Sequence, residues 1–213
     1  MSRPKGSLAA DHETKRRDLL TKMTTRLMHR QAARPSLRDL AGAAEVSVPT
    51  LRHYFGGRQA VVDAVLADCL RVGRDGLDAQ RSSDRPFAES IQGYAEALIR
   101  ALQAPRPVKL GDIFAVSLAE GFLDPQIGAS ALNHIVEPTL QVLEARLEEH
   151  MRRGEMIQAD ARAAGLMLLS PLLVACLHQD QLNGTHVRPL STQDLALSVS
   201  EAFVRAYAVR VPA

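Results

Sequence analysis

The sequence predicts an all-α protein. Hydrophobic residues make up 46% of the 213-residue chain, but aromatic residues make up only 4% and Trp is absent. The core must therefore be filled mainly by aliphatic residues, Ala and Met, most of which favour helices. No stretch alternates β-branched and polar residues between turn signals, as half-buried strands do. We expect a small N-terminal helical domain followed by a larger helical bundle.

The first 56 residues divide into three predicted helices. We expect a disordered basic arm over residues 1–10 and a first helix over residues 11–30, where apolar side chains recur at helical spacing. Ser36 then begins a second helix as its N-cap, with an acid three residues later. Ser47 begins a third helix, with Pro49 in the first turn, where a missing N–H costs little.

The third helix has one apolar and one polar face. Val48, Leu51 and Phe55 recur at helical spacing and should point inward. The remaining side chains then point outward: Pro49, Thr50, Arg52 and His53. Because the second and third helices are joined by only a few residues, residues 11–56 have the layout of a helix-turn-helix domain.

The basic charge of this region indicates a polyanionic partner, double-stranded DNA. Residues 1–58 contain 12 Lys/Arg and 5 Asp/Glu, a net charge of +7, whereas residues 59–213 contain 14 and 19, a net charge of −5. Thr50 and Arg52 can reach base edges, and the amides at the start of the second helix can hold a phosphate. The candidate DNA-binding residues are Ser36, Arg38, Ser47, Pro49, Thr50, Arg52, His53, Tyr54 and Arg58.

Arg58 is the most informative of these residues. A cation in the first turn of a helix opposes the helix dipole by about 0.3–1 kcal/mol. The position becomes favourable if an anion lies between the helix amides and the guanidinium, and we expect a DNA phosphate to be that anion.

The rest of the chain also shows helical patterns. Residues 57–72 should form a helix that links the first domain to a bundle formed by residues 73–213. Proline and glycine divide this bundle into predicted helices at 86–103, 108–122, 126–136, 139–153, 160–179 and 191–209. Pro138 is expected to separate the third and fourth of these helices.

Nothing in the sequence directs the chain out of the cytoplasm. Residues 1–10 lack the apolar stretch of a signal peptide. The longest apolar run, residues 163–177, is shorter than a membrane span requires and fits a buried helix. Cys69 and Cys176 lie in apolar helical patterns without basic neighbours, which favours buried thiols over redox sensors. We therefore expect a cytoplasmic protein with no membrane segment.

Residues 36–66, SLRDLAGAAEVSVPTLRHYFGGRQAVVDAVL, resemble the tetracycline-repressor (TetR) family of regulators. The resemblance rests on Leu-Ala-x-Ala-Ala, Val-Ser, Thr-Leu, His-Tyr-Phe and a basic residue before an apolar helix. It differs at Glu45, where the family often has Gly or Asn, at Arg52, where it often has Tyr, and at Gly57, where it often has a polar cap. A left-handed conformation at Glu45 would cost about 1 kcal/mol.

The resemblance implies a C-terminal bundle that binds a ligand and dimerises. It implies a homodimer formed through the last two helices, about residues 160–179 and 191–209. The apolar character of residues 161–177 on nearly all sides agrees, because such a helix must be covered on more than one side. The resemblance also implies a pocket for a small-molecule effector. Its candidate lining residues are Tyr94, Phe114, His134, Met167 and His178.

The predicted function is ligand-responsive, sequence-specific transcription regulation. The resemblance implies a repressor that binds a palindromic operator as a homodimer and is released by a small molecule, with no cofactor. An enzyme is not predicted, because the sequence has no nucleophile elbow, phosphate loop or HExxH motif. His134 and Glu137 could hold a metal with His178, but no further protein ligand is obvious beyond these. The remaining alternative is a helical protein-interaction module without DNA binding.

Overall fold

The computed structural model describes residues 5–29 and 34–209, with the backbone alone described for residues 5–10. No strand occurs in these ranges, and the only extended pairing is an isolated bridge between Met156 and Ala208. The all-α prediction is therefore confirmed. The helical elements are α1 (Lys5–Leu27), α2 (Leu37–Ala43), α3 (Val48–Phe55), α4 (Arg58–Asp78), α5 (Phe87–Gln103), α6 (Leu110–Leu123), α7 (Pro125–Ala131), η1 (Leu132–Val136), α8 (Glu137–Arg152), α9 (Ala161–Cys176), η2 (Leu177–Gln181), α10 (Gly184–Val187) and α11 (Thr192–Tyr207).

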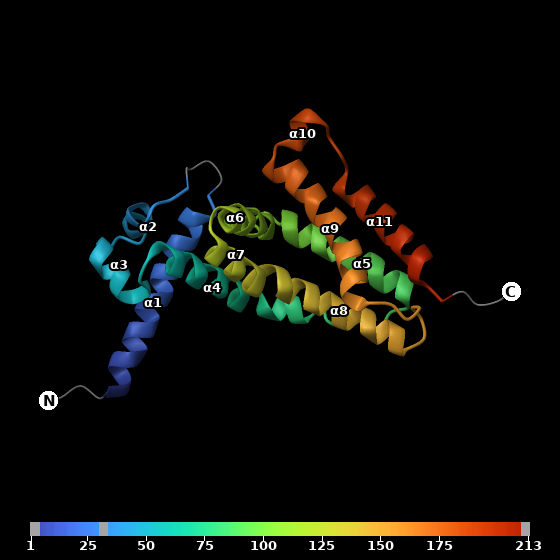
Figure 1. Cartoon of the computed structure of the whole chain (residues 1–213), viewed down its shortest axis with the longest axis horizontal. Helices are drawn as coiled ribbons and strands as arrows, with labels where there is room; N and C mark the ends of the chain where they lie inside the picture. Colours follow the sequence, from blue (N-terminus) through green and yellow to red (C-terminus); the bar gives the residue numbers. More distant parts are fainter. Residues whose placement is uncertain (1–4, 30–33, 210–213) are drawn as a thin grey trace.

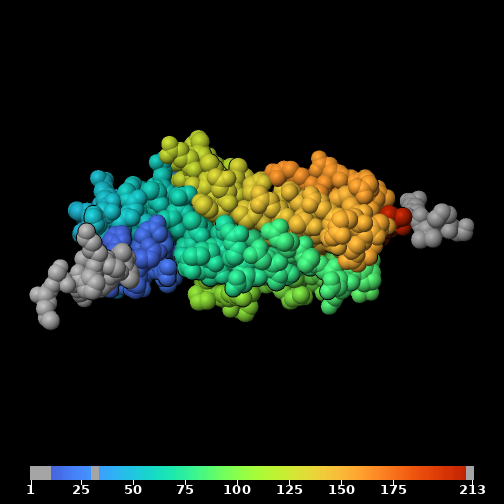
Figure 2. Space-filling model, turned by 90° about the horizontal axis from the view of Figure 1, so that it is seen from below, coloured from blue at the N-terminus to red at the C-terminus, as the bar shows by residue number. Residues whose placement is uncertain are grey.

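The molecule is elongated, with α1–α3 at one end and the bundle of α5–α11 at the other (Figure 1). Helix α4 joins the two parts, because it contacts α1 and α3 as well as α6, α7, η1 and α8. Seen from below, α4 and α8 lie side by side along the long axis (Figure 2). The far side of the bundle is formed by α9 and α11, which pack on α5.

One apolar cluster runs through both parts. Its largest fully buried side chains are almost all aliphatic or Met, as the composition requires: Phe114, Leu19, Met23, Leu40, Leu51, Leu66, Ile91, Ile99, Leu102, Ile127, Leu140 and Leu143. Each such side chain contributes roughly 1.5–3 kcal/mol by leaving water. Burial of aliphatic side chains therefore drives the assembly of the helices.

Two predicted boundaries near the N-terminus are wrong. Helix α1 begins at Lys5, so the predicted disordered arm is helical from residue 5 onward, and its first four residues lie outside the described ranges. Helix α4 runs from Arg58 to Asp78, six residues beyond the predicted end of the linking helix at residue 72. Residues 73–78 are exposed apart from the half-buried Leu77, so this extension has no apolar face that the sequence pattern could have shown.

The predicted break at Pro138 is also absent. The chain is helical without interruption from Pro125 to Arg152, through the π-helical turn η1. Pro138 is the second residue of α8, a position near a helix start where proline is tolerated. The π-helical turn before it changes the hydrogen-bond pattern from i→i+4 to i→i+5, which allows α8 to start afresh at Glu137.

Helix α9 and η2 together form a continuous apolar helix of 21 residues, Ala161–Gln181. By length and composition alone this helix could cross a membrane, although 39% of its apolar window is buried inside the molecule. It packs against α5, α8 and α11. Its outer face carries Leu166, Met167 and Val174, which are 42%, 61% and 61% exposed.

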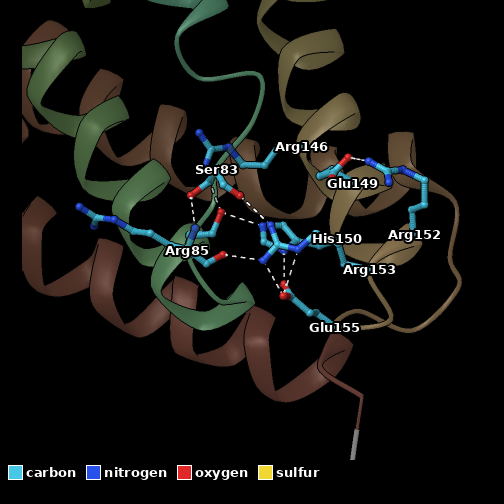
Figure 3. Close-up of polar contacts among 9 residues, drawn as sticks. Ser83, Arg85, Arg146, Glu149, His150, Arg152, Arg153 and Glu155 are labelled. Carbon is cyan, nitrogen blue, oxygen red and sulfur yellow. Dashed lines mark hydrogen bonds and ion pairs between the residues drawn. The ribbon is translucent and has the colours of Figure 1, made fainter.

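A buried polar network ties the end of the bundle together (Figure 3). His150 is fully buried on α8, with Nδ1 2.6 Å from Glu155 and Nε2 2.8 Å from the Ser90 hydroxyl on α5. Arg146 Nη1 donates to the same hydroxyl at 2.9 Å, and its Nε donates to the carbonyl of Gln80 just beyond α4. The network therefore links α8 to α5 and to the end of α4.

The Glu155 carboxylate settles which ring nitrogen of His150 carries the proton. An ionised carboxylate can only accept, so Nδ1 of His150 donates to Glu155. In the neutral imidazole Nε2 then accepts from the Ser90 hydroxyl, whose oxygen also accepts from Arg146. Burial lowers the pKa of His150 more strongly than Glu155 raises it. The folded protein therefore holds a neutral imidazole at this position.

This arrangement predicts that stability falls as pH decreases through about 6.5, the usual pKa of histidine. Below that pH the unfolded chain binds a proton that the folded chain excludes, which favours unfolding. Urea titrations between pH 7.5 and 5.5 measure the effect. His150→Gln should cost about 1–3 kcal/mol at pH 7.5, because it disturbs buried hydrogen bonds, and should flatten the pH dependence. The exposed His186→Gln serves as control, and an unchanged slope in His150→Gln would contradict the assignment.

Candidate nucleic-acid interface

Capping side chains define the start of α2 and α3, as the sequence predicts. The Ser36 hydroxyl accepts from the backbone N–H of Asp39, and the Asp39 carboxylate accepts from the N–H of Ser36, which completes a capping box. The hydrogen bonds from Ser36 hold the pKa of Asp39 below its usual value. The Ser47 hydroxyl accepts from the N–H of Thr50 at 3.1 Å, and Pro49 lies in the first turn of α3.

The two faces of α3 also match the prediction. Leu51 is fully buried, and Val48 and Phe55 are half-buried against the core. The exposed residues of this region include Ser36, Arg38, Ser47, Pro49, Arg52 and His53. Thr50 is half-buried, and its hydroxyl lies 2.8 Å from that of Ser47, so the cap positions it. The exposed end of the molecule thus presents a small, polar and basic helix face.

The turn between α2 and α3 has a strained, left-handed residue at Glu45, the position where the TetR family often has Gly or Asn. Glu45 adopts the left-handed region with φ of 57°, at a cost of about 1 kcal/mol for a residue with a Cβ. Its carboxylate forms an ion pair with Lys22 on α1. The turn geometry is therefore kept despite the residue type, and the turn is held against the first helix.

Tyr54 packs between helices instead of pointing outward. Its ring stacks on His12 of α1, with centroids 4.6 Å apart, and His53 meets it edge-on at 5.5 Å. Tyr54 is half-buried, so its ring joins α3 to α1. This contact places His53 at the exposed edge of an aromatic group.

Arg58 already has an anionic partner inside the protein. Its Nη1 and Nη2 donate to the two carboxylate oxygens of Glu120 on α6, at 2.9 and 2.5 Å, and its Nε donates to the carbonyl of Pro35 at 2.7 Å. Arg34 donates to the same carboxylate, with Nε 2.9 Å from Oε2. The anion that the sequence analysis assigned to a DNA phosphate is supplied here by Glu120.

Glu120 is a functional candidate that the sequence analysis missed. It is 4% exposed. Burial opposes its ionisation, but hydrogen bonds from Arg58 and Arg34 outweigh burial and hold the pKa of Glu120 below its usual value. The available signal is an acid near the end of a largely apolar helix, which does not identify a partner 62 residues away.

The five candidate effector-binding residues are not gathered in one site. Tyr94 and Phe114 are buried in the core. His134 on η1 lies 3.1 Å from the Asp63 carboxylate of α4, and His178 on η2 lies 2.8 Å from the Gln179 amide. A hollow of about 370 Å³ between α1, α3 and α4 and one of about 230 Å³ between α5 and α11 contain none of the five.

Two further residue hypotheses need correction. Met167 does not line an interior pocket, because it is 61% exposed on the outer face of α9, where its sulfur accepts from the Tyr207 hydroxyl. Glu137 pairs with Arg162 and His134 with Asp63, so they do not form a common metal site. No group of three or more potential metal ligands occurs within the described ranges.

Both cysteines are free thiols. Burial raises the pKa of Cys69 and of Cys176 to about 12. At neutral pH both remain protonated, and a protonated thiol is a poor nucleophile.

Comparison with known proteins identifies the fold. No protein-family model and no curated protein matches the sequence. Among solved structures, a TetR-family transcriptional regulator from Mesorhizobium loti superposes with a TM-score of 0.75 at 18% identity, over 93% of this chain and 98% of the other. A TetR-family regulator from a Rhodococcus species gives a TM-score of 0.68 at 15% identity, over 91% and 98%.

A transcriptional regulator from Saccharomonospora viridis, solved in complex with choline, is also similar. Its TM-score is 0.69 at 18% identity, over 93% of this chain and the whole of the other. The likeness extends over nearly the full length in all three cases, so it includes the C-terminal bundle as well as α1–α4. The chain therefore has the fold of TetR-family regulators, and the resemblance seen in residues 36–66 is confirmed at the level of the fold.

The Ser47 cap allows a direct test of the local geometry. Ser47→Ala should lower the free energy of unfolding by about 1 kcal/mol, because the N–H of Thr50 loses its acceptor. Ser198→Ala, at an exposed position inside α11, is the matched control and should cause no loss. Urea unfolding of the two variants checks the prediction, and equal stability would show that the cap contributes nothing.

Proposed function

We propose that this protein is a non-enzymatic, cytoplasmic transcription regulator that binds a palindromic operator as a homodimer and releases it when a small molecule binds. The observation that carries the proposal is the exposed polar face of α3, held on a buried Leu51 at the basic end of the molecule. Such a helix fits the major groove, where base edges differ in their donors and acceptors.

The proposed contacts divide into two kinds. Arg52, which is exposed, is assigned to a guanine, and Thr50, Pro49 and His53 lie beside it on the same helix. Ser36 and Arg38 at the start of α2 are assigned to phosphates, together with the free amides of that helix. Ser47 positions Thr50 through its cap, Tyr54 holds α3 against α1, and Arg58 is assigned to the junction with the bundle.

Replacing Arg52 tests the assignment of bases. Arg52→Ala should weaken binding to a selected operator at least about tenfold, because a bidentate contact to guanine contributes about 1–3 kcal/mol. The slope of affinity against salt concentration should change little, whereas Arg38→Ala should reduce that slope by about one unit for each phosphate that the protein no longer neutralises. Fluorescence anisotropy with oligonucleotides selected from a random pool gives both quantities.

Arg100→Ala, an exposed arginine on α5, is the control and should leave affinity and slope unchanged. If the protein selects no oligonucleotide even at low salt, the proposed function is wrong. A helical protein-interaction module would then be the better interpretation.

The proposed dimer buries the apolar outer faces of α9 and α11. Leu166, Met167 and Val174 on α9 and Leu197 on α11 are all more than 40% exposed in the single chain. Exposed apolar side chains on two helices that pack together suit a protein–protein interface. A twofold axis through it would pair each helix with its copy and present two α3 helices to one face of DNA.

A single charge in this patch should prevent dimerisation. Val174→Asp is expected to give monomers at micromolar concentration, because an unpaired carboxylate would be buried in the interface. Val72→Asp is the matched control, since Val72 is 71% exposed on α4, away from the patch. Sedimentation equilibrium distinguishes the two states, and a monomeric wild type would rule out the dimer.

The effector is assigned to the C-terminal bundle without a defined chemical class. Tyr94 and Phe114 face the interior there, and the similar Saccharomonospora viridis regulator was solved with choline. An effector can weaken DNA binding only if it prefers one arrangement of the two α3 helices over the other.

A further inference from the structure

Both ends of the helix-turn-helix segment, defined here as residues 36–57, are tied to one carboxylate. Just before the segment, Arg34 donates through Nε to Oε2 of Glu120 on α6 at 2.9 Å, and its Nη2 lies 2.8 Å from the same oxygen. Immediately after it, Arg58 donates to both oxygens of Glu120. The carboxylate belongs to the C-terminal bundle, whereas the two arginines flank α2 and α3.

Further hydrogen bonds join the same elements. Arg58 Nε donates to the carbonyl of Pro35, which joins the two ends of the segment to each other. Gln59, the next residue of α4, donates to Asp124 at 2.6 Å, one turn beyond Glu120 at the end of α6. The start of α4 is thus held to α6 at two successive points.

Burial decides between two roles for Glu120. A carboxylate that competed with DNA for the arginines would have to lie where a phosphate could replace it. Instead Glu120 is 5% exposed and Arg58 is 20% exposed at the side chain, whereas Arg34 is 43% exposed. Water screens a buried pair less than an exposed one, so its geometry is held more firmly. The burial favours a fixed junction over a competitor.

We propose that Glu120 is a positioning residue that sets the angle of the helix-turn-helix segment relative to the C-terminal bundle, and hence the operator spacing that the dimer accepts. The inference deepens the proposed function and rests on it. Any displacement of α6 moves Glu120 and, through Arg34 and Arg58, both ends of the segment together.

The test compares Glu120→Gln with wild type on operators whose central spacer is lengthened or shortened by one base pair. One base pair moves a half-site by about 3.4 Å and rotates it by about a tenth of a turn. We expect wild type to lose about tenfold in affinity on this change, and Glu120→Gln to lose about threefold or less. Fluorescence anisotropy measures the ratio, which a general loss of stability does not alter.

Glu137→Gln is the matched control. Glu137 forms a two-point ion pair of the same kind with Arg162, but within the bundle between α8 and α9. In Glu137→Gln, affinity should depend on the length of the operator spacer as it does in wild type. The same dependence in Glu120→Gln would overturn the proposal. Tighter binding by Glu120→Gln at every spacing would also overturn it, because Glu120 would then be a competitor for the arginines.

A measurement without DNA separates this inference from the proposed function. Spin labels at Gly42→Cys on α2 and Glu148→Cys on α8, in a Cys69→Ala, Cys176→Ala background, report the distance between the two parts within one chain. Added atoms at Gly42 meet nothing within 4 Å, and Glu148 is exposed. We expect a narrow distance distribution that broadens in Glu120→Gln and not in Glu137→Gln.

An unchanged distribution in Glu120→Gln would overturn the junction even if the protein binds DNA. Failure of wild type to bind any operator, with the broadening observed, would instead overturn the proposed function alone. If circular dichroism shows Glu120→Gln to be unfolded, Arg34→Gln removes one arm of the junction at a more exposed side chain. The same broadening is expected there, and its absence would count against the proposal.

Discussion

The ion pair between Glu120 and Arg58 is the contact on which the N-terminal end of the molecule depends. Helices α2 and α3 have seven and eight residues, too few to be stable in isolation. They persist because Leu40 and Leu51 are buried against α1 and α4 and because the ends of the segment are fixed. The buried core decides that the two helices form, and the junction decides how they face the rest of the chain.

A second polar cluster occupies the opposite end of the bundle. There His150, Ser90 and Arg146 join α5, α8 and the end of α4 in an otherwise aliphatic interior. Buried polar groups add little net stability over apolar ones, but removing one partner is costly. Leu and Met side chains can pack with the helices in several relative positions, whereas these hydrogen bonds form in only one of those positions. We infer that both polar clusters fix the positions of the helices that they join.

Features determined by neighbouring residues could be predicted. Ser36 and Ser47 cap their helices because a hydroxyl needs only the N–H groups two or three residues later. The inward position of Leu51 and the outward position of Arg52 follow from the helical period alone. The candidate DNA-binding face was therefore largely visible in the sequence.

Features determined by distant partners could not be predicted. The role of Arg58 changed because its anion comes from α6, 62 residues away. Met167 was assigned to a pocket because an apolar helix does not show which of its sides faces the core. Pro138 did not break the chain because a π-helical turn precedes it, and a π-helical turn has no clear local signal.

The sequence by itself determined the helical class, the caps and the two faces of α3, because backbone hydrogen bonds and helical periodicity act over a few residues. Only the tertiary structure decided the partner of Arg58, the exposure of Met167 and the neutral imidazole of His150. Those properties depend on which charges and apolar surfaces meet across the bundle, and the free energy of burying them is set by the whole assembly.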